Sequence, residues 1–191
     1  FIRLIESRNA ITFVGQYIPN LKAGALRDAL DIYESSKELK ILIPEYNKTD
    51  RIFSASNGSI MEFKSYQNAQ DAKSGKRDYS FFNEVNGVPR SVFEQNHLRP
   101  KKQTFIDYNP DAEFWVHDEI IGQPNVELLI SDHRHNPFCQ QKIRDKLESL
   151  RHKDIELFKV YARGMTGKIE GLIFRNHNIV PDVPLGAEFV A

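Results

Sequence analysis

The chain has 191 residues, 40% of them hydrophobic and 27% charged, and its 26 basic and 26 acidic residues give a formal net charge of zero. This composition is ordinary for one globular α/β domain, and the zero net charge argues against a protein that coats nucleic acid through its overall field. The single Cys139 excludes an intramolecular disulfide, and no apolar run approaches the roughly 20 residues of a membrane-spanning helix.

The first elements along the chain alternate between helix and strand. Apolar residues on one face predict an amphipathic helix over residues 1–8, and a β-rich run follows over 10–15. After a turn at 18–20, apolar residues at helical spacing predict one long helix over 21–39, with its apolar stripe in the core.

A β-hairpin is predicted in the next segment. Two short apolar runs, 51–54 and 59–63, flank the pair Asn57-Gly58. Asn-Gly between two such runs is the strongest short signal for a two-residue type I′ turn, so we expect the two runs to pair antiparallel.

The most informative segment is an apolar run that ends abruptly in polar side chains. Residues 79–82 predict a short buried strand, which is followed directly by Asn83 and Glu84 and then by the turn Asn86-Gly87. In open α/β sheets, residues that follow a strand lie at the carboxyl edge, where ligands bind.

A second segment repeats this design. After a helical pattern around 92–98, residues 104–109 predict a strand that is closed by Pro110 and carries Asp107 and Asn109 near its end. The two strand ends therefore predict one shared crevice, although alternation along the strand leaves open whether Asp107 faces it. Polar residues after a buried strand also occur in ordinary loops of proteins that bind no nucleotide.

The remaining chain predicts a further strand over 126–130 and a helix over 137–150, with Asn136 as its N-cap. A helical stretch over 154–162 ends at Gly164, and residues 170–174 predict a short strand.

One cluster has residue types that bind transition metals. Asp132, His133 and His135 lie close together in the sequence, and His117 offers a further ligand. The segment directly precedes the predicted N-cap, where Asp and Asn are expected for backbone reasons, so a structural loop is favoured over the alternative of a metal-dependent hydrolase.

The order of these motifs resembles the ATPase domain of the large subunit of phage terminases, the motor that packages viral DNA. The resemblance rests on five stretches over most of the chain. They are Asn57-Gly58-Ser59-Ile60-Met61-Glu62-Phe63, Phe82-Asn83-Glu84-Val85-Asn86, Phe105-Ile106-Asp107-Tyr108-Asn109-Pro110, His135-Asn136-Pro137-Phe138, and Val160-Tyr161-Ala162-Arg163-Gly164 running into Glu170-Gly171-Leu172-Ile173-Phe174.

The resemblance implies an α/β fold of P-loop NTPase type, with a mostly parallel sheet flanked by helices, that hydrolyses ATP with Mg²⁺ as cofactor. It places Glu84 at the Walker B glutamate that activates the attacking water. Asn83 takes the place of the usual Mg²⁺-associated aspartate, where a neutral amide still hydrogen-bonds a metal-bound water. Asn109 resembles the coupling motif that senses the γ-phosphate, and Asp107 is a further candidate for cofactor binding.

The resemblance also implies partners and a place of action. Lys73 resembles the basic residue that acts in trans on a neighbouring subunit's nucleotide, although the family pattern has arginine there and lysine supplies no bidentate fork. The implied partners are double-stranded DNA, the portal, the small terminase subunit and other copies in a ring. The implied location is the cytoplasm of a bacterial host, with no membrane partner.

The sequence lacks the Gly-rich loop ending in Gly-Lys-Ser/Thr that a P-loop NTPase needs. We therefore expect residues 1–165 to be a terminase ATPase domain without its N-terminal phosphate loop, which would lie roughly ten residues before Phe1. Residues 166–191 are expected to begin the transition to a nuclease domain that is absent. The alternative is a non-catalytic, degenerate ATPase fold that keeps subunit or DNA contacts.

Overall fold

The computed structural model describes residues 1–166 and divides the chain into two compact units. The first unit comprises Phe1–Asn109 and Phe114–Glu127, and the second comprises Pro110–Glu113 and the residues from Leu128 onward. The predicted strand over 170–174 and most of the predicted transition segment lie outside the described residues.

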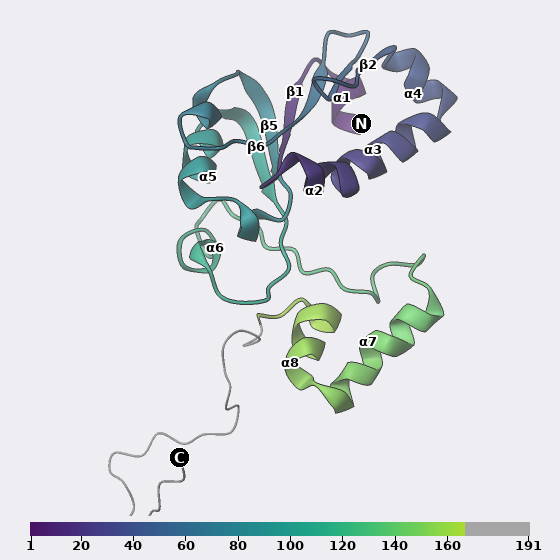
Figure 1. The fold of residues 1–191 in the computed structure, drawn as a ribbon, viewed down its shortest axis with the longest axis vertical. Coiled ribbons are helices and arrows are strands. Elements are labelled where there is room, and N and C mark those ends of the chain that lie inside the picture. Colours follow the sequence, from purple (N-terminus) through teal and green to yellow (C-terminus); the bar gives the residue numbers. More distant parts are fainter. Residues whose placement is uncertain (167–191) are drawn as a thin grey trace, which may run out of the picture. The chain divides into compact units, whose positions relative to one another are not determined.

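The first unit is built on a six-stranded sheet in the order β2-β3-β4-β1-β5-β6 (Figure 1). β4, β1, β5 and β6 run parallel, whereas β3 pairs antiparallel with both β4 and β2. The α/β fold with a mostly parallel sheet is therefore confirmed. The strands are β1 (Ala10–Val14), β2 (Glu45–Asn47), β3 (Ile52–Ser54), β4 (Ile60–Lys64), β5 (Arg77–Phe82) and β6 (Pro100–Ile106).

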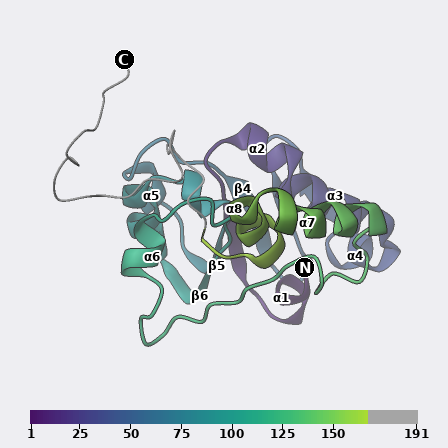
Figure 2. The same ribbon diagram turned by 90° about the horizontal axis from the view of Figure 1, so that it is seen from below.

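Helices cover both faces of this sheet (Figures 1 and 2). One apolar cluster joins β1, β3 and β4 to α1, α2 and α3, and a second joins β1 and β5 to η2, α5 and α6. The helices are α1 (Ile2–Glu6), α2 (Ile18–Ala23), α3 (Ala25–Ser35), α4 (Lys37–Leu42), α5 (Arg90–His97) and α6 (Trp115–Glu119), with 3₁₀ turns η1 (Asp71–Lys73) and η2 (Val85–Gly87).

Aromatic side chains align the central parallel strands. The Phe13 ring of β1 stacks on Phe63 of β4 at 4.8 Å between centroids and on Phe81 of β5 at 5.0 Å. Because a one-residue slip would turn every side chain to the opposite face, these stacks specify the register. In that register Val14 pairs with Phe82 and Phe82 with Ile106, so three strands end at the same edge.

The predicted hairpin is present, but its turn is not of type I′. β3 and β4 pair as expected, yet only Gly58 of the central pair has a positive φ, of 80°, whereas a type I′ turn needs positive φ at both positions. The loop is longer than two residues. It is closed by Gly58 N–H donating to the Ala55 carbonyl, and the Asn57 side chain accepts from Ser59 N–H.

The single helix predicted over 21–39 is wrong, because the structure breaks it into α2, α3 and α4. Gly24 separates α2 from α3 with a backbone conformation outside the helical region, and Ser36 starts α4 as an N-cap that accepts from Leu39 N–H. Pro19 lies in the first turn of α2 and not in a turn before it. A serine inside an apolar stripe can cap a new helix without disturbing the periodicity.

The second unit contains α7 (Gln141–Lys153), α8 (Ile155–Leu157) and η3 (Phe158–Ala162), a short π-helix. The strand predicted over 126–130 is wrong, since these residues join no sheet, and the helix predicted from Pro137 begins only at Gln141. The Asn136 side chain instead accepts from Phe138 N–H and stabilises a local turn. Among residues 1–166, no helix is both long and apolar enough to cross a membrane.

Candidate active site

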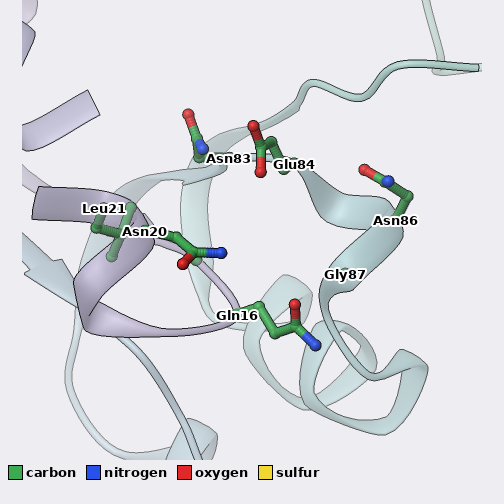
Figure 3. Close-up of a pocket in the computed structure, with 8 residues that line it drawn as sticks. Gln16, Asn20, Leu21, Asn83, Glu84, Asn86 and Gly87 are labelled. Atoms are coloured by element: carbon green, nitrogen blue, oxygen red, sulfur yellow. The ribbon is translucent and has the colours of Figure 1, made fainter. Parts of the chain in front are cut away.

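A small pocket lies at the carboxyl edge of the sheet, where β1 and β5 end. Its volume is about 110 Å³, and Figure 3 shows Asn83 and Glu84 side by side at its rim, with Gln16 after β1, Asn20 in α2 and Asn86 in η2 also lining it. The predicted crevice shared by the ends of β5 and β6 is not what the structure shows, because the pocket lies between the ends of β1 and β5 and no described residue after β6 lines it. The full lining is Gly15, Gln16, Asn20, Leu21, Asn83, Glu84, Asn86 and Gly87.

A glycine allows the walls of the pocket to approach each other. A Cβ at Gly15 would lie 2.7 Å from Cγ of the buried Leu21, which is too short for non-bonded atoms, so the lack of a side chain lets α2 pack against the end of β1. A Cβ at Gly87 would lie 2.7 Å from Oε1 of Gln16, but that atom is the end of a flexible side chain that can rotate away. The residues Gln16 and Asn20 were not predicted, although Gly15-Gln16 follows β1 as Asn83-Glu84 follows β5.

Glu84 has a left-handed backbone, with φ 53° and ψ 58°. Of the non-glycine residues that the structure describes, only Arg51 shares a positive φ. This conformation costs about 1–2 kcal/mol for a residue with a Cβ. A hydrogen bond to a charged group contributes about 1.5–3 kcal/mol, which is enough to offset that cost.

Asp107 supplies such a hydrogen bond. Its Oδ1 accepts a hydrogen bond from the Glu84 N–H at 2.5 Å. The main chain of Asp107 also bonds the residues near Glu84: its N–H donates to Phe82 O at 3.0 Å, and its carbonyl accepts from Val85 N–H at 2.9 Å. Burial raises the pKa of the Asp107 carboxyl; the Glu84 N–H opposes that rise and the Glu84 charge adds to it. Asp107 therefore contacts the main chain of Glu84.

Asn83 continues the main-chain ladder past the end of β5. Its N–H donates to Val14 O at 2.8 Å, which fixes the residue between the two strand ends and places its side chain beside Glu84 (Figure 3). Amide and carboxylate oxygens are hard ligands of the kind that Mg²⁺ and its bound waters accept. The pair thus has the donor types for a hydrated magnesium ion.

Asn109 and Lys73 do not line the pocket. β6 ends at Ile106, so the prediction that Asn109 ends this strand is wrong: Asn109 is exposed and lies three residues beyond it, and Asp107 is the first residue after the strand. Lys73 is exposed at the end of η1. The roles predicted for both residues remain predictions.

The histidine cluster does not form a metal site. In the described part of the chain, no group of three or more His, Cys, Asp or Glu side chains is arranged to hold a metal ion. His133 Nε2 lies 2.9 Å from Glu148 Oε1, and His117 Nδ1 accepts from the Phe114 N–H. The contacts of His133 and His117 agree with the structural-loop interpretation.

Asp132 is the centre of that loop. Its buried side chain, 3% exposed, accepts from the backbone N–H and guanidinium of Arg134 and lies 3.2 Å from His135 and 3.9 Å from Arg163. The hydrogen bonds from Arg134 chiefly hold the pKa of the Asp132 carboxyl well below its usual range. Because the pKa is lower in the folded state, the carboxylate stabilises the fold above about pH 4 and this contribution is lost as the pH falls below that value.

We expect Asp132→Asn to lower the free energy of unfolding by about 1.5–3 kcal/mol at pH 7, and the loss to shrink steadily below about pH 4. Urea unfolding followed by circular dichroism at several pH values measures this. Asp145→Asn is the matched control, because Asp145 accepts only from the exposed Gln141 side chain of the same unit. If Asp132→Asn and Asp145→Asn lower the free energy of unfolding equally, Asp132 does not stabilise the loop through its buried hydrogen bonds.

Solved structures share the fold of the chain. The large terminase of the thermophilic bacteriophage D6E matches with a TM-score of 0.65 at 14% identity, over 87% of this chain and 42% of that one. The D6E protein in complex with ADP matches at 0.64 and 16% identity, over 83% and 40%. A variant of the Thermus phage P74-26 large terminase ATPase domain matches at 0.55 and 11% identity, over 84% and 78%.

These matches confirm the predicted P-loop NTPase-like fold, which is the fold of terminase ATPase domains. The chain spans about two fifths of the length of the D6E proteins that it matches. No family model matches the sequence, and no curated protein matches it.

Proposed function

We propose that this chain is part of the ATPase domain of a phage terminase large subunit, which hydrolyses ATP to drive double-stranded DNA into a capsid. The observation that carries the proposal is the placement of Asn83 and Glu84 at a pocket on the carboxyl edge of β5, in a sheet with the terminase ATPase fold. An exposed carboxylate can act as a base toward water, and an amide beside it can hydrogen-bond a water of a hydrated Mg²⁺.

The pocket fits one end of a Mg²⁺–nucleotide complex and not the whole. Its volume of about 110 Å³ is well below the roughly 300 Å³ at which pockets for drug-sized ligands begin, and its lining contains no lysine or arginine to neutralise phosphates. The lining does supply oxygen ligands from Asn83 and Glu84. We therefore propose that sequence outside these 191 residues supplies the Gly-rich phosphate loop.

In this proposal each residue has a distinct task. Glu84 orients the attacking water and takes its proton, and Asn83 would hydrogen-bond a water of a bound Mg²⁺, which would supply positive charge to the phosphates. Asn109 couples the nucleotide state to movement, and Lys73 offers a positive charge to a neighbouring subunit.

The proposed assembly follows from the same relation to terminases. Copies form a ring on the portal in the host cytoplasm, act on DNA with the small terminase subunit, and carry a nuclease domain in the complete protein. No part of this assembly involves a membrane.

Nucleotide binding tests the proposal directly. We expect the complete protein to bind ATP-γ-S with Mg²⁺ in calorimetry and to hydrolyse ATP faster when DNA is present. Residues 1–191 alone are expected to bind at least about 100-fold more weakly and not to hydrolyse ATP, because they lack the charge-assisted hydrogen bonds of a phosphate loop.

Two results would contradict this account. A complete protein that binds no nucleotide would favour the non-catalytic module that keeps only subunit or DNA contacts. Tight, Mg²⁺-dependent binding by residues 1–191 alone would show that the phosphates are held by residues other than a separate Gly-rich loop.

A further inference from the structure

We propose that Asp107 is a positioning residue for Glu84: its carboxylate holds the Glu84 backbone in the left-handed conformation that presents the Glu84 side chain to the pocket. The inference rests on the proposed function, in which the Glu84 side chain activates water at the pocket. It adds a task for Asp107 that is separate from binding nucleotide or metal.

The geometry separates these two tasks. Asp107 does not line the pocket, and its Oδ1 is occupied by the Glu84 N–H at 2.5 Å. A carboxylate that ligates a metal or a nucleotide would face the cavity beside Asn83, and Glu84 supplies the one carboxylate among the described residues that line the pocket. The Asp107 side chain thus contacts the main chain of Glu84 and not the pocket.

The left-handed conformation needs this support because Glu84 carries a Cβ, which disfavours positive φ. The same turn is fixed from both sides by main-chain bonds, Val85 N–H to Asp107 O and Gly87 N–H to Glu84 O, each 2.9 Å long. The Glu84 N–H is the one donor of this turn that only a side chain satisfies. Losing that acceptor would release the residue toward an extended backbone and turn its side chain away from the pocket.

The pKa of Asp107 agrees with an acceptor beside Glu84 at a solvent-exposed position after the strand. Desolvation raises this pKa, the donated Glu84 N–H works against that rise, and the Glu84 carboxylate adds to it. A neutral amide oxygen accepts the same hydrogen bond without the charge. Asparagine at this position therefore keeps the hydrogen bond to Glu84 N–H and removes only the charge.

The test compares Asp107→Ala and Asp107→Asn in the complete protein. We expect Asp107→Ala to lower kcat at least tenfold, to change the affinity for ATP-γ-S less than threefold, and to speed amide hydrogen exchange across 83–87. Asp107→Asn is expected to restore most of kcat and of the exchange protection, because its amide oxygen still accepts from Glu84 N–H.

Asp78→Ala is the matched control for stability. Asp78 also accepts a backbone N–H, that of Ala10 at 2.8 Å, but near the opposite end of β5. We expect this variant to lose stability while keeping kcat and the exchange protection of 83–87. If Asp78→Ala and Asp107→Ala lose the same stability and also lose the same kcat, the positioning role is wrong.

Two further outcomes also decide the matter. If Asp107→Asn is as inactive as Asp107→Ala, the negative charge itself is used and the positioning role is wrong. If Asp107→Ala leaves exchange across 83–87 unchanged, the hydrogen bond does not hold the turn. The exchange measurement needs no turnover, so it tests the positioning role even if the complete protein proves not to hydrolyse ATP.

Discussion

Glu84→Gln in the complete protein is expected to reduce ATP turnover at least about 100-fold while leaving nucleotide affinity largely intact. The amide is nearly isosteric with the carboxylate and fills the same rim of the pocket, but it cannot take a proton from water. The loss should therefore fall on kcat, measured as phosphate release at saturating ATP, and the Kd for ATP-γ-S should stay within about threefold.

Glu94→Gln is the matched control for this variant. Glu94 lies on α5, and its Oε1 is 3.0 Å from Nε of Arg90. It does not line the pocket, so its substitution removes the same charge without touching the site. We expect near-normal turnover from this control. Near-normal turnover from Glu84→Gln as well would show that another group activates water and that the Walker B assignment is wrong.

The left-handed backbone of Glu84 gives this prediction a structural basis. A residue kept in a costly conformation at the rim of a pocket must be held there by its surroundings, and here the ends of β5 and β6 hold it. Such strain is concentrated at functional sites more often than elsewhere. The observation supports Glu84 independently of the likeness to other proteins.

Sequence patterns predict what depends on local chemistry. The apolar runs before Asn83 and Asp107 predict two strands, and their pairing as parallel neighbours follows because polar residues end both at one edge. The hairpin around Gly58 is likewise predictable from its turn residues. These signals lie within a few residues of the features that they predict.

Patterns fail where the apolar periodicity carries no trace of the deciding contact, whether that contact is a local cap or lies elsewhere in the chain. The periodic apolar residues over 21–39 fit one helix and three helices equally well, and only the capping hydrogen bond of Ser36 and the conformation of Gly24 select three. Alternation along β6 could not decide where Asp107 points. That direction depends on the Glu84 N–H, which lies 23 residues away and beyond the end of β5.

The end of β6 illustrates the same limit for the site. The sequence predicts that Asn109 ends the strand, because Pro110 interrupts the run after it, whereas the strand stops at Ile106. Asn109 is instead the last residue of the first compact unit before the chain passes into the second at Pro110. The coupling role of Asn109 stays a prediction, which a substitution tests.

Asn109→Ala is accordingly expected to reduce the length of DNA packaged per ATP hydrolysed severalfold, while changing the affinity for ATP-γ-S less than threefold. If the side chain discriminates between nucleotide states, its loss weakens the coupling between them more than it weakens binding. An in vitro packaging reaction with procapsids, in which packaged DNA and released phosphate are measured together, gives this ratio.

Asn57→Ala is the control that separates coupling from turn capping. The Asn57 side chain accepts from Ser59 N–H in the hairpin between β3 and β4 and donates to Leu4 O at 3.0 Å and Ile5 O at 3.3 Å, so its loss should cost at least about 1 kcal/mol of stability and leave the ratio unchanged. If Asn109→Ala behaves in the same way, Asn109 caps a turn and has no part in the motor. If instead Asn109→Ala lowers the DNA packaged per ATP and Asn57→Ala does not, at equal stability, Asn109 is assigned to coupling. A loss of stability common to both variants cannot explain a ratio that falls in only one of them.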